Sequence, residues 1–268
     1  MNYGPVSSLE GAAAFGVAQV QVRATAACLV DWWAQRLERG WTAAAQTVAM
    51  WAAPRLAEVV VAITQAPAEV LDEVVRPQNQ VAMLASHPIP VGPGPTWTER
   101  PASVAYRGGH SDQKGAVVLV GVARLLGAHG VAVNIVGGGR AAPRVEAAHS
   151  PTRRFRGAVD DVRSPARSLH GFRVGGAAHY HTHFPMHAYS DPLKIKDYLA
   201  VGMSLVSGLS SNVDDGVDGG TGRSVAEMVG ATWVALSEPT RFEPSEHPLL
   251  VGAGQSLQAL VVAVEASL

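Results

Sequence analysis

The feature that most constrains the fold of this sequence is an uninterrupted succession of strand, helix and strand between residues 102 and 136. Residues 102–106 form a short apolar run typical of a buried strand, and residues 115–128 have the pattern of a helix. Residues 131–136 are rich in β-branched side chains, which favours a second strand. Two strands joined by a helical crossover lie parallel in one sheet. We therefore expect an α/β protein with a parallel, Rossmann-like sheet.

The stretch before this unit has the composition of a linker. Residues 87–101 hold five prolines and two glycines, so we place a domain boundary there. The α/β domain then occupies residues 102–268. Beyond the first unit, the sequence predicts a long Arg-rich loop (137–170), a strand (172–183), a helix (191–206), a short helix (224–228), a strand (231–236) and a final helix (256–268).

The N-terminal part, residues 1–86, is rich in alanine and is expected to be helical. Ser7 and Glu10 have the spacing of a capping box, which marks a helix start. A second helix is expected from Thr42, with its apolar face continuing through 59–63. The expected organisation is therefore a helical N-terminal segment, a Pro-rich linker and an α/β domain.

Composition excludes several classes of protein. The chain of 268 residues has a formal net charge of -1, which gives no global field for nucleic acid or acidic lipid. Its one cysteine, Cys28, rules out an internal disulfide framework and indicates a reducing compartment. The N-terminus lacks a signal-peptide pattern, and no apolar run is long enough to span a bilayer. We expect a protein of the bacterial cytoplasm that binds neither nucleic acid nor membrane.

One dense cluster of ligand-type side chains stands out. On a strand, His179, His181 and His183 share one face, and His187 and Asp191 follow closely. Imidazole and carboxylate ligands suit zinc, iron or manganese, so these five residues are the candidate metal ligands. The alternative is a histidine-rich strand end that is exposed or hydrogen-bonded and binds no metal. As a metal site, the cluster would activate a water molecule in a hydrolase.

A second candidate site follows the first strand of the α/β domain. His110, Ser111 and Asp112 come directly after that strand, at the edge where parallel sheets place their ligand crevices. The alternative interpretation is a turn followed by a helix cap, which accounts for all three residues. The sequence contains no GxSxG motif, so an α/β-hydrolase serine is not expected.

Residues 107–137, RGGHSDQKGAVVLVGVARLLGAHGVAVNIVG, resemble the first strand–helix–strand unit of von Willebrand factor A-like domains. The chain is similar, more narrowly, to an uncharacterised A-like family encoded by actinobacterial phages and mobile elements. The similarity lies in the Gly-Trp pair at 40–41, the KGA helix start at 114–116 and the DPL helix start at 191–193. The DxSxS metal motif of A domains is absent. The resemblance therefore implies a protein-binding module rather than an enzyme.

These features lead to one expected function and two alternatives. The expected function is that of a phage- or mobile-element-encoded α/β module that acts by protein–protein contact or self-association and uses no evident cofactor. The first alternative is a metal-dependent hydrolase that uses the histidine cluster with Zn, Fe or Mn. The second is a virion or assembly component, suggested by the Ala-rich N-terminal part and the 16% content of charged residues.

Overall fold

The structure is a computed structural model of the chain. The chain divides into two compact units. Unit 1 comprises Met1–Ser86, Tyr189–Asp191 and Gly252–Leu268, and unit 2 comprises His87–Ala188 and Pro192–Val251. The structure describes residues 2–5, 25–29, 48, 51, 52, 54–57, 59–62, 81–83, 94–110, 115–147, 152–156, 168–177, 193–208, 224–239, 246, 250, 255, 258, 261, 262 and 265.

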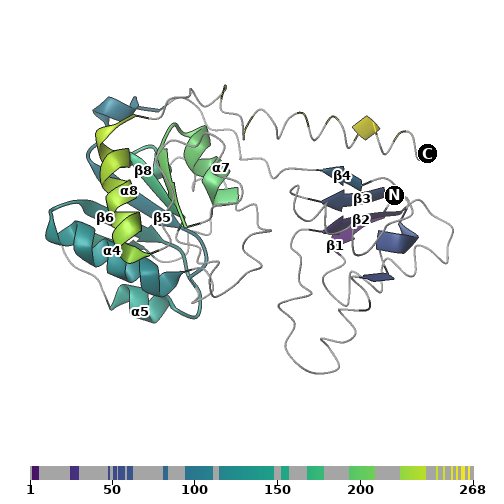
Figure 1. Ribbon diagram of the computed structural model, residues 1–268, viewed down its shortest axis with the longest axis horizontal. Helices are drawn as coiled ribbons and strands as arrows, with labels where there is room; N and C mark the ends of the chain where they lie inside the picture. The colour runs from purple at the N-terminus through teal and green to yellow at the C-terminus, as the bar shows by residue number, and fades with distance from the viewer. Residues whose placement is uncertain are drawn as a thin grey trace. The chain divides into compact units, whose positions relative to one another are not determined.

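Unit 1 contains a four-stranded sheet (Figure 1). Its strands are β1 (Asn2–Pro5), β2 (Thr25–Leu29), β3 (Val59–Ala62) and β4 (Val81–Met83). They follow the order β1-β2-β3-β4, and each neighbouring pair is parallel. The N-terminal part is therefore built on a parallel sheet.

The expectation of a purely helical segment at 1–86 is wrong at these strands. The strands β2 and β3 occupy stretches that the sequence pattern assigned to helices. Residues 60–62 are fully buried, as parallel strands covered on both faces usually are. A short, continuous run of small and β-branched residues has no periodicity to separate a buried strand from a buried helix.

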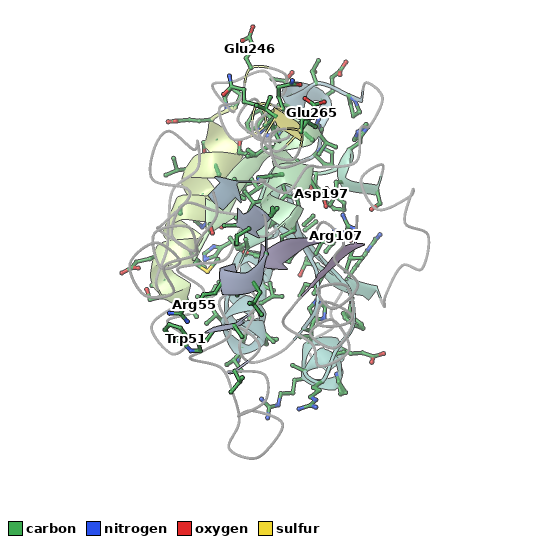
Figure 2. All side chains as sticks on the ribbon, turned by 90° about the vertical axis from the view of Figure 1, so that its right-hand side faces the viewer. Trp51, Arg55, Arg107, Asp197, Glu246 and Glu265 are labelled. Carbon is green, nitrogen blue, oxygen red and sulfur yellow. The ribbon has the colours of Figure 1, made fainter. Side chains whose placement is uncertain are left out.

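The described helical residues of unit 1 are 48, 51, 52 and 54–56, together with 255, 258, 261, 262 and 265 near the end of the sequence. The residues near 55 carry a contact between two side chains. There the guanidinium of Arg55 lies 5.8 Å from the centroid of the Trp51 ring (Figure 2). The same side chain donates a hydrogen bond to the Trp51 carbonyl at 3.2 Å. The Arg55 side chain thus makes both a cation–π contact and a backbone hydrogen bond with the same residue, Trp51.

Unit 2 is built on a five-stranded sheet in which all neighbouring strands are parallel. The strands are β5 (Ser103–Arg107), β6 (Ala132–Val136), β7 (Arg153–Arg156), β8 (Val174–Ala177) and β9 (Ser204–Ser207). Their order is β7-β6-β5-β8-β9. The predicted parallel, Rossmann-like α/β architecture is confirmed, including the first strand–helix–strand unit.

Helices cover both faces of this sheet (Figure 1). The helices α4 (Ala116–Ala128) and α8 (Val225–Ser237) pack on one face, in a core with Val104 and Tyr106 of β5. Helix α7 (Leu193–Ala200) packs on the other face with Ala105. Successive residues of a strand point to opposite faces, so β5 is buried on both.

The structure also describes two shorter helices in unit 2. Helix α5 is Ala142–Glu146, and the 3₁₀ helix η2 is Trp97–Glu99. Among the described residues, no helix has the length and apolar character needed to cross a bilayer.

Four expected elements of unit 2 differ from the structure. The helix expected over 191–206 ends at Ala200, and its last residues form β9. The chain reverses at Gly202, whose φ of 68° lies in the left-handed region that glycine adopts readily. The short helix and strand expected over 224–236 are the single helix α8, and the expected loop 137–170 contains α5 and β7.

The end of the Pro-rich stretch is ordered against the amino-terminal edge of the unit 2 sheet. The buried guanidinium of Arg100 donates hydrogen bonds to the carbonyls of Pro95, Phe172, Val201 and Gly202 at 2.5–3.3 Å. Because Phe172 precedes β8 and Gly202 precedes β9, one side chain joins the starts of these strands. Burial lowers the pKa of Arg100 from its ordinary value.

Two tyrosine rings pack against a pair of glycines in β8. A Cβ atom at Gly175 would overlap the ring of Tyr198 in α7, and one at Gly176 would overlap the ring of Tyr106 in β5. Both tyrosines are buried, Tyr198 fully and Tyr106 with 2% exposed. The absence of side chains at this pair lets aromatic rings approach β8 from both faces.

Alanine at either glycine of β8 is expected to destabilise unit 2. Gly175→Ala and Gly176→Ala should each lower the free energy of unfolding by about 1–3 kcal/mol, because the added methyl group overpacks the core. Urea denaturation followed by circular dichroism measures this. The control is Gly230→Ala in α8, where a Cβ meets nothing within 4 Å. It should gain about 0.5–1 kcal/mol from helix propensity. Wild-type stability in Gly176→Ala would contradict the packing described here.

Candidate functional site

The candidate site lies at the carboxyl edge of the unit 2 sheet, between β5 and β8. The chain passes from β5 to β6 on one side, and returns to the other side of β5 to form β8. In open α/β sheets, ligands bind at such a reversal of strand order, outside the carboxyl ends of the strands. The residues there come from the end of β5, the loops that follow β5 and β6, and helix α7.

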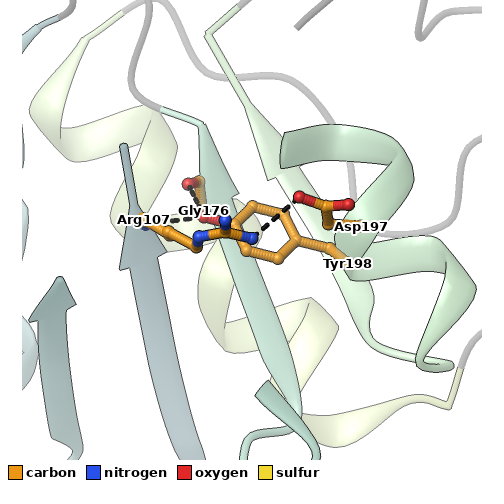
Figure 3. A network of polar contacts seen from close by, with 4 residues as sticks. All are labelled: Arg107, Gly176, Asp197 and Tyr198. Carbon is orange, nitrogen blue, oxygen red and sulfur yellow. Dashed lines mark hydrogen bonds and ion pairs between the residues drawn. The ribbon is translucent and has the colours of Figure 1, made fainter. Parts of the chain in front are cut away.

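The hydroxyl of Tyr198 bridges β5 and β8 where their pairing ends (Figure 3). It accepts a hydrogen bond from the backbone N–H of Arg107 at 2.7 Å and donates one to the carbonyl of Gly176 at 3.1 Å. The last paired residues of the two strands are Tyr106 and Gly176. Beyond this pair the strands diverge, and their backbone N–H and C=O groups no longer bond to each other. The hydroxyl of Tyr198 is the hydrogen-bond partner that both groups need.

Asp197, the neighbour of Tyr198 on α7, holds the side chain of the same arginine. The Nη1 atom of Arg107 lies 2.8 Å from Oδ2 of Asp197, and the two side chains are turned toward each other in Figure 3. The side chain of Asp197 is 7% exposed and that of Arg107 is 27% exposed. Burial raises the pKa of Asp197 from its usual value, and the positive charge of Arg107 opposes that rise.

The loops after β5 and β6 are joined through their backbones. The N–H of Gly108 donates to the carbonyl of Val136 at 3.0 Å, and the N–H of His110 donates to that of Gly138 at 2.7 Å. Gly137 has a φ of 140°, and a Cβ atom there would overlap the carbonyl oxygen of Gly108. This contact requires glycine at 137. The result is a pair of closely packed backbone loops at the edge of the sheet.

His110 is the buried histidine of this edge. It is 5% exposed, and its ring centroid lies 5.7 Å from that of Phe155 in β7. Its carbonyl accepts a hydrogen bond from Ala141 at the start of α5, at 3.1 Å. Within the described part of the chain, its Nδ1 atom has no hydrogen-bond partner. Burial lowers the pKa of His110, and the positive charge of Lys194 lowers it further, so both effects favour the neutral imidazole.

The structure places one of the sequence-predicted site residues. His110 lies at the carboxyl edge of β5, as expected. Ser111 and Asp112 lie outside the described residues, and so do all five candidate metal ligands: His179, His181, His183, His187 and Asp191. Among the residues that are described, no group of three or more histidine, cysteine or acidic side chains could hold a metal ion.

Sequence reasoning missed Arg107, Asp197 and Tyr198 as members of this site. Two signals pointed toward them: Arg107 directly follows the strand predicted at 102–106, and Asp197 and Tyr198 lie in a predicted helix that opens with Asp-Pro. Nothing in the sequence joins positions separated by 90 residues. Their contact became visible only with the strand order.

The stability of unit 2 is expected to fall as the solution is acidified below the ordinary histidine pKa of 6.5. Because the pKa of His110 is lowered on folding, the unfolded chain binds a proton that the folded protein excludes. The contribution of this group is complete above pH 6.5 and is lost as the pH falls through the lower folded-state pKa.

Urea denaturation of the wild type and of His110→Gln across this range measures that contribution. His110→Gln should show a weaker fall in unfolding free energy on acidification than the wild type. His129→Gln, at an exposed histidine of unit 2, is the control for loss of a histidine. Equal slopes in the wild type and His110→Gln would show that His110 is not the group responsible.

Several solved structures share this overall fold. The pneumococcal O-GlcNAc transferase GtfA, solved with UDP and GlcNAc, matches 94% of this chain and 54% of its own with a TM-score of 0.66 at 10% identity. TarM matches 95% of this chain and 53% of its own, with a TM-score of 0.66 at 12% identity. HepE from Anabaena, solved with UDP and glucose, matches 93% and 76%, with a TM-score of 0.61 at 13% identity.

These likenesses show the fold. The chain spans about half the length of GtfA and TarM. No protein-family model matches the sequence, and no curated protein matches it in sequence.

The expected von Willebrand A-like identity is wrong, because the similar structures include sugar transferases such as GtfA and the galactosyltransferase WaaB. The expectation of a non-catalytic phage module falls with it, and the metal-dependent hydrolase and the virion component find no support. The strand–helix–strand unit at 102–136 is common to parallel α/β folds, so it could not distinguish among them. The three short motifs that pointed to an A-like family are too brief to identify one.

Proposed function

We propose that this chain binds a UDP-sugar and takes part in glycosyl transfer, with the nucleotide sugar held at the carboxyl edge of the unit 2 sheet. The observation that carries the proposal is the similarity over more than 90% of the chain to GtfA and HepE, whose structures contain UDP together with a sugar. The position of Arg107 at the reversal of strand order supports it, because such edges bind nucleotides in other α/β proteins.

The charges at this edge suit a diphosphate. Helix α7 carries Lys194 and Lys196 against the single carboxylate Asp197, and that carboxylate is paired with Arg107. The Nζ atom of Lys194 would lie 3.5 Å from a Cβ atom at Gly108, so ammonium and backbone loop are neighbours. Cationic side chains beside glycine-rich backbone are the usual groups that bind phosphate.

The reaction needs stabilisation of a leaving group that gains negative charge. An acceptor hydroxyl attacks the anomeric carbon of the sugar, and the bond from that carbon to the diphosphate oxygen breaks. UDP leaves with the electron pair of this bond, and the proton of the acceptor hydroxyl passes to the departing diphosphate or to water. Cations held in place at the diphosphate lower the barrier because their attraction increases as the charge develops. We assign that role to Arg107 and Lys194.

UDP should bind to the purified chain, and removal of either cation should weaken the binding. Arg107→Gln and Lys194→Gln should each lower UDP affinity by about tenfold to a hundredfold, because a hydrogen bond to a charged group contributes about 1.5–3 kcal/mol. Isothermal titration calorimetry measures the affinities. Release of UDP from UDP-glucose and UDP-GlcNAc, assayed in parallel, reports turnover.

The matched control is Arg124→Gln, which removes a positive charge from an exposed position of α4. It should bind UDP as the wild type does. Circular dichroism and urea denaturation establish that each variant is folded. A folded wild-type chain that shows no UDP binding at millimolar concentration would overturn the proposed function.

A further inference from the structure

We propose that Tyr198 is a positioning residue of this site, whose hydroxyl fixes the end of β5 so that the Arg107 side chain faces the ligand in one orientation. The proposal rests on the proposed function for the identity of the ligand, the diphosphate of a UDP-sugar. Tyr198 itself touches no ligand in this account, and it acts through Arg107.

Helix α7 holds Arg107 at two points through consecutive residues. The hydroxyl of Tyr198 accepts from the Arg107 backbone N–H at 2.7 Å, and the carboxylate of Asp197 accepts from Nη1 at 2.8 Å (Figure 3). Backbone and side chain are therefore both anchored to the same turn of one helix. Rotation of the arginine away from the edge would break one of these two bonds.

The anchored guanidinium keeps donors for a ligand. A guanidinium carries five N–H donors, and one of its nitrogens serves Asp197. In the part of the chain that the structure describes, Nε and Nη2 of Arg107 donate no hydrogen bond, and the side chain is 27% exposed. A planar donor group that is already oriented loses little further entropy when an anion binds. The two anchors thus prepare Arg107 for a phosphate oxygen.

Of the two buried tyrosines in the described part of the chain, only Tyr198 has a hydroxyl that bridges two strands; the other is Tyr106. Tyr106 also packs its ring against β8, on the opposite face, at Gly176. The Tyr106 hydroxyl lies beside Thr232 and bridges no strands, whereas the Tyr198 hydroxyl joins β5 to the carbonyl of Gly176. Burial raises the pKa of Tyr198, which keeps its hydroxyl protonated and able to donate. Tyr106 is therefore a matched control for loss of a buried tyrosine hydroxyl.

The first measurement needs no ligand. In Tyr198→Phe the ring still packs on Gly175, but the backbone N–H of Arg107 loses its acceptor. Amide hydrogen exchange followed by NMR should show at least about tenfold faster exchange at Arg107 in this variant, because exchange requires the bond to be open. Tyr106→Phe should leave exchange at Arg107 at the wild-type rate. Unchanged exchange in Tyr198→Phe would overturn the positioning role.

The second measurement separates positioning from a general loss of structure. Tyr198→Phe should lower affinity for UDP by about fivefold to tenfold and leave affinity for uridine within about twofold of wild type, because only UDP presents a diphosphate to Arg107. In the background of Arg107→Gln, the same substitution should have little further effect on UDP affinity, because residues that act as a unit are not additive. Tyr106→Phe should bind both ligands as wild type does.

Each result decides a separate question. Equal losses for UDP and uridine, or full additivity with Arg107→Gln, would overturn the inference that Tyr198 acts through Arg107. A wild-type chain that binds no UDP would overturn the proposed function, and with it the ligand assigned to Arg107. The exchange rate at Arg107 then still decides whether the Tyr198 hydroxyl fixes the end of β5.

Discussion

The structure of unit 2 depends on how β5 and β8 part at their carboxyl ends. The two strands are paired from Val104 to Tyr106, and beyond this point each has a backbone polar group directed toward the gap. Tyr198 fills that position with a single hydroxyl, which accepts from one strand and donates to the other. Its ring fits because Gly175 has no side chain. The backbone polar groups at this opening therefore have hydrogen-bond partners. Ligands of other open α/β sheets bind at such openings, which is why we propose the site there.

The two edges of the unit 2 sheet each hold an arginine, and the two arginines differ in how deeply they are buried. At the amino-terminal edge, the guanidinium of Arg100 is almost completely enclosed and donates to backbone carbonyls of segments that lead into β8 and β9. At the carboxyl edge, the guanidinium of Arg107 is partly exposed and is held by one carboxylate. An arginine is thus enclosed at one edge of the sheet, and another is left partly exposed at the opposite edge. Enclosed donors stabilise strand starts, whereas exposed donors at the carboxyl edge are suited to a ligand.

Features whose pattern lies within one short segment of the sequence could be predicted, whereas contacts between distant segments could not. The strand–helix–strand unit was predictable because its strands, crossover helix and glycine stops all lie within 102–136. The strand β3 and residues 231–236 of helix α8 were assigned to the wrong class, since both are apolar runs of small and β-branched residues without a distinguishing period. The position of His110 at the carboxyl edge was predictable because it follows a predicted strand, and its role as a site residue stays a prediction. Arg107, Asp197 and Tyr198 were missed because their contact depends on strand order, which no local pattern records.

The ion pair of Arg107 and Asp197 orients the guanidinium more than it stabilises the folded protein. The carboxyl group of Asp197 has a raised pKa, which means that the attraction of Arg107 does not fully offset the cost of burying a charge. Partly buried ion pairs of this kind are often no more stable than apolar residues of similar volume. What the pair does provide is a fixed direction for the guanidinium, from a carboxylate that is itself anchored beside Tyr198. Perturbed ionisable groups of this kind gather at functional edges, where geometry counts for more than stability.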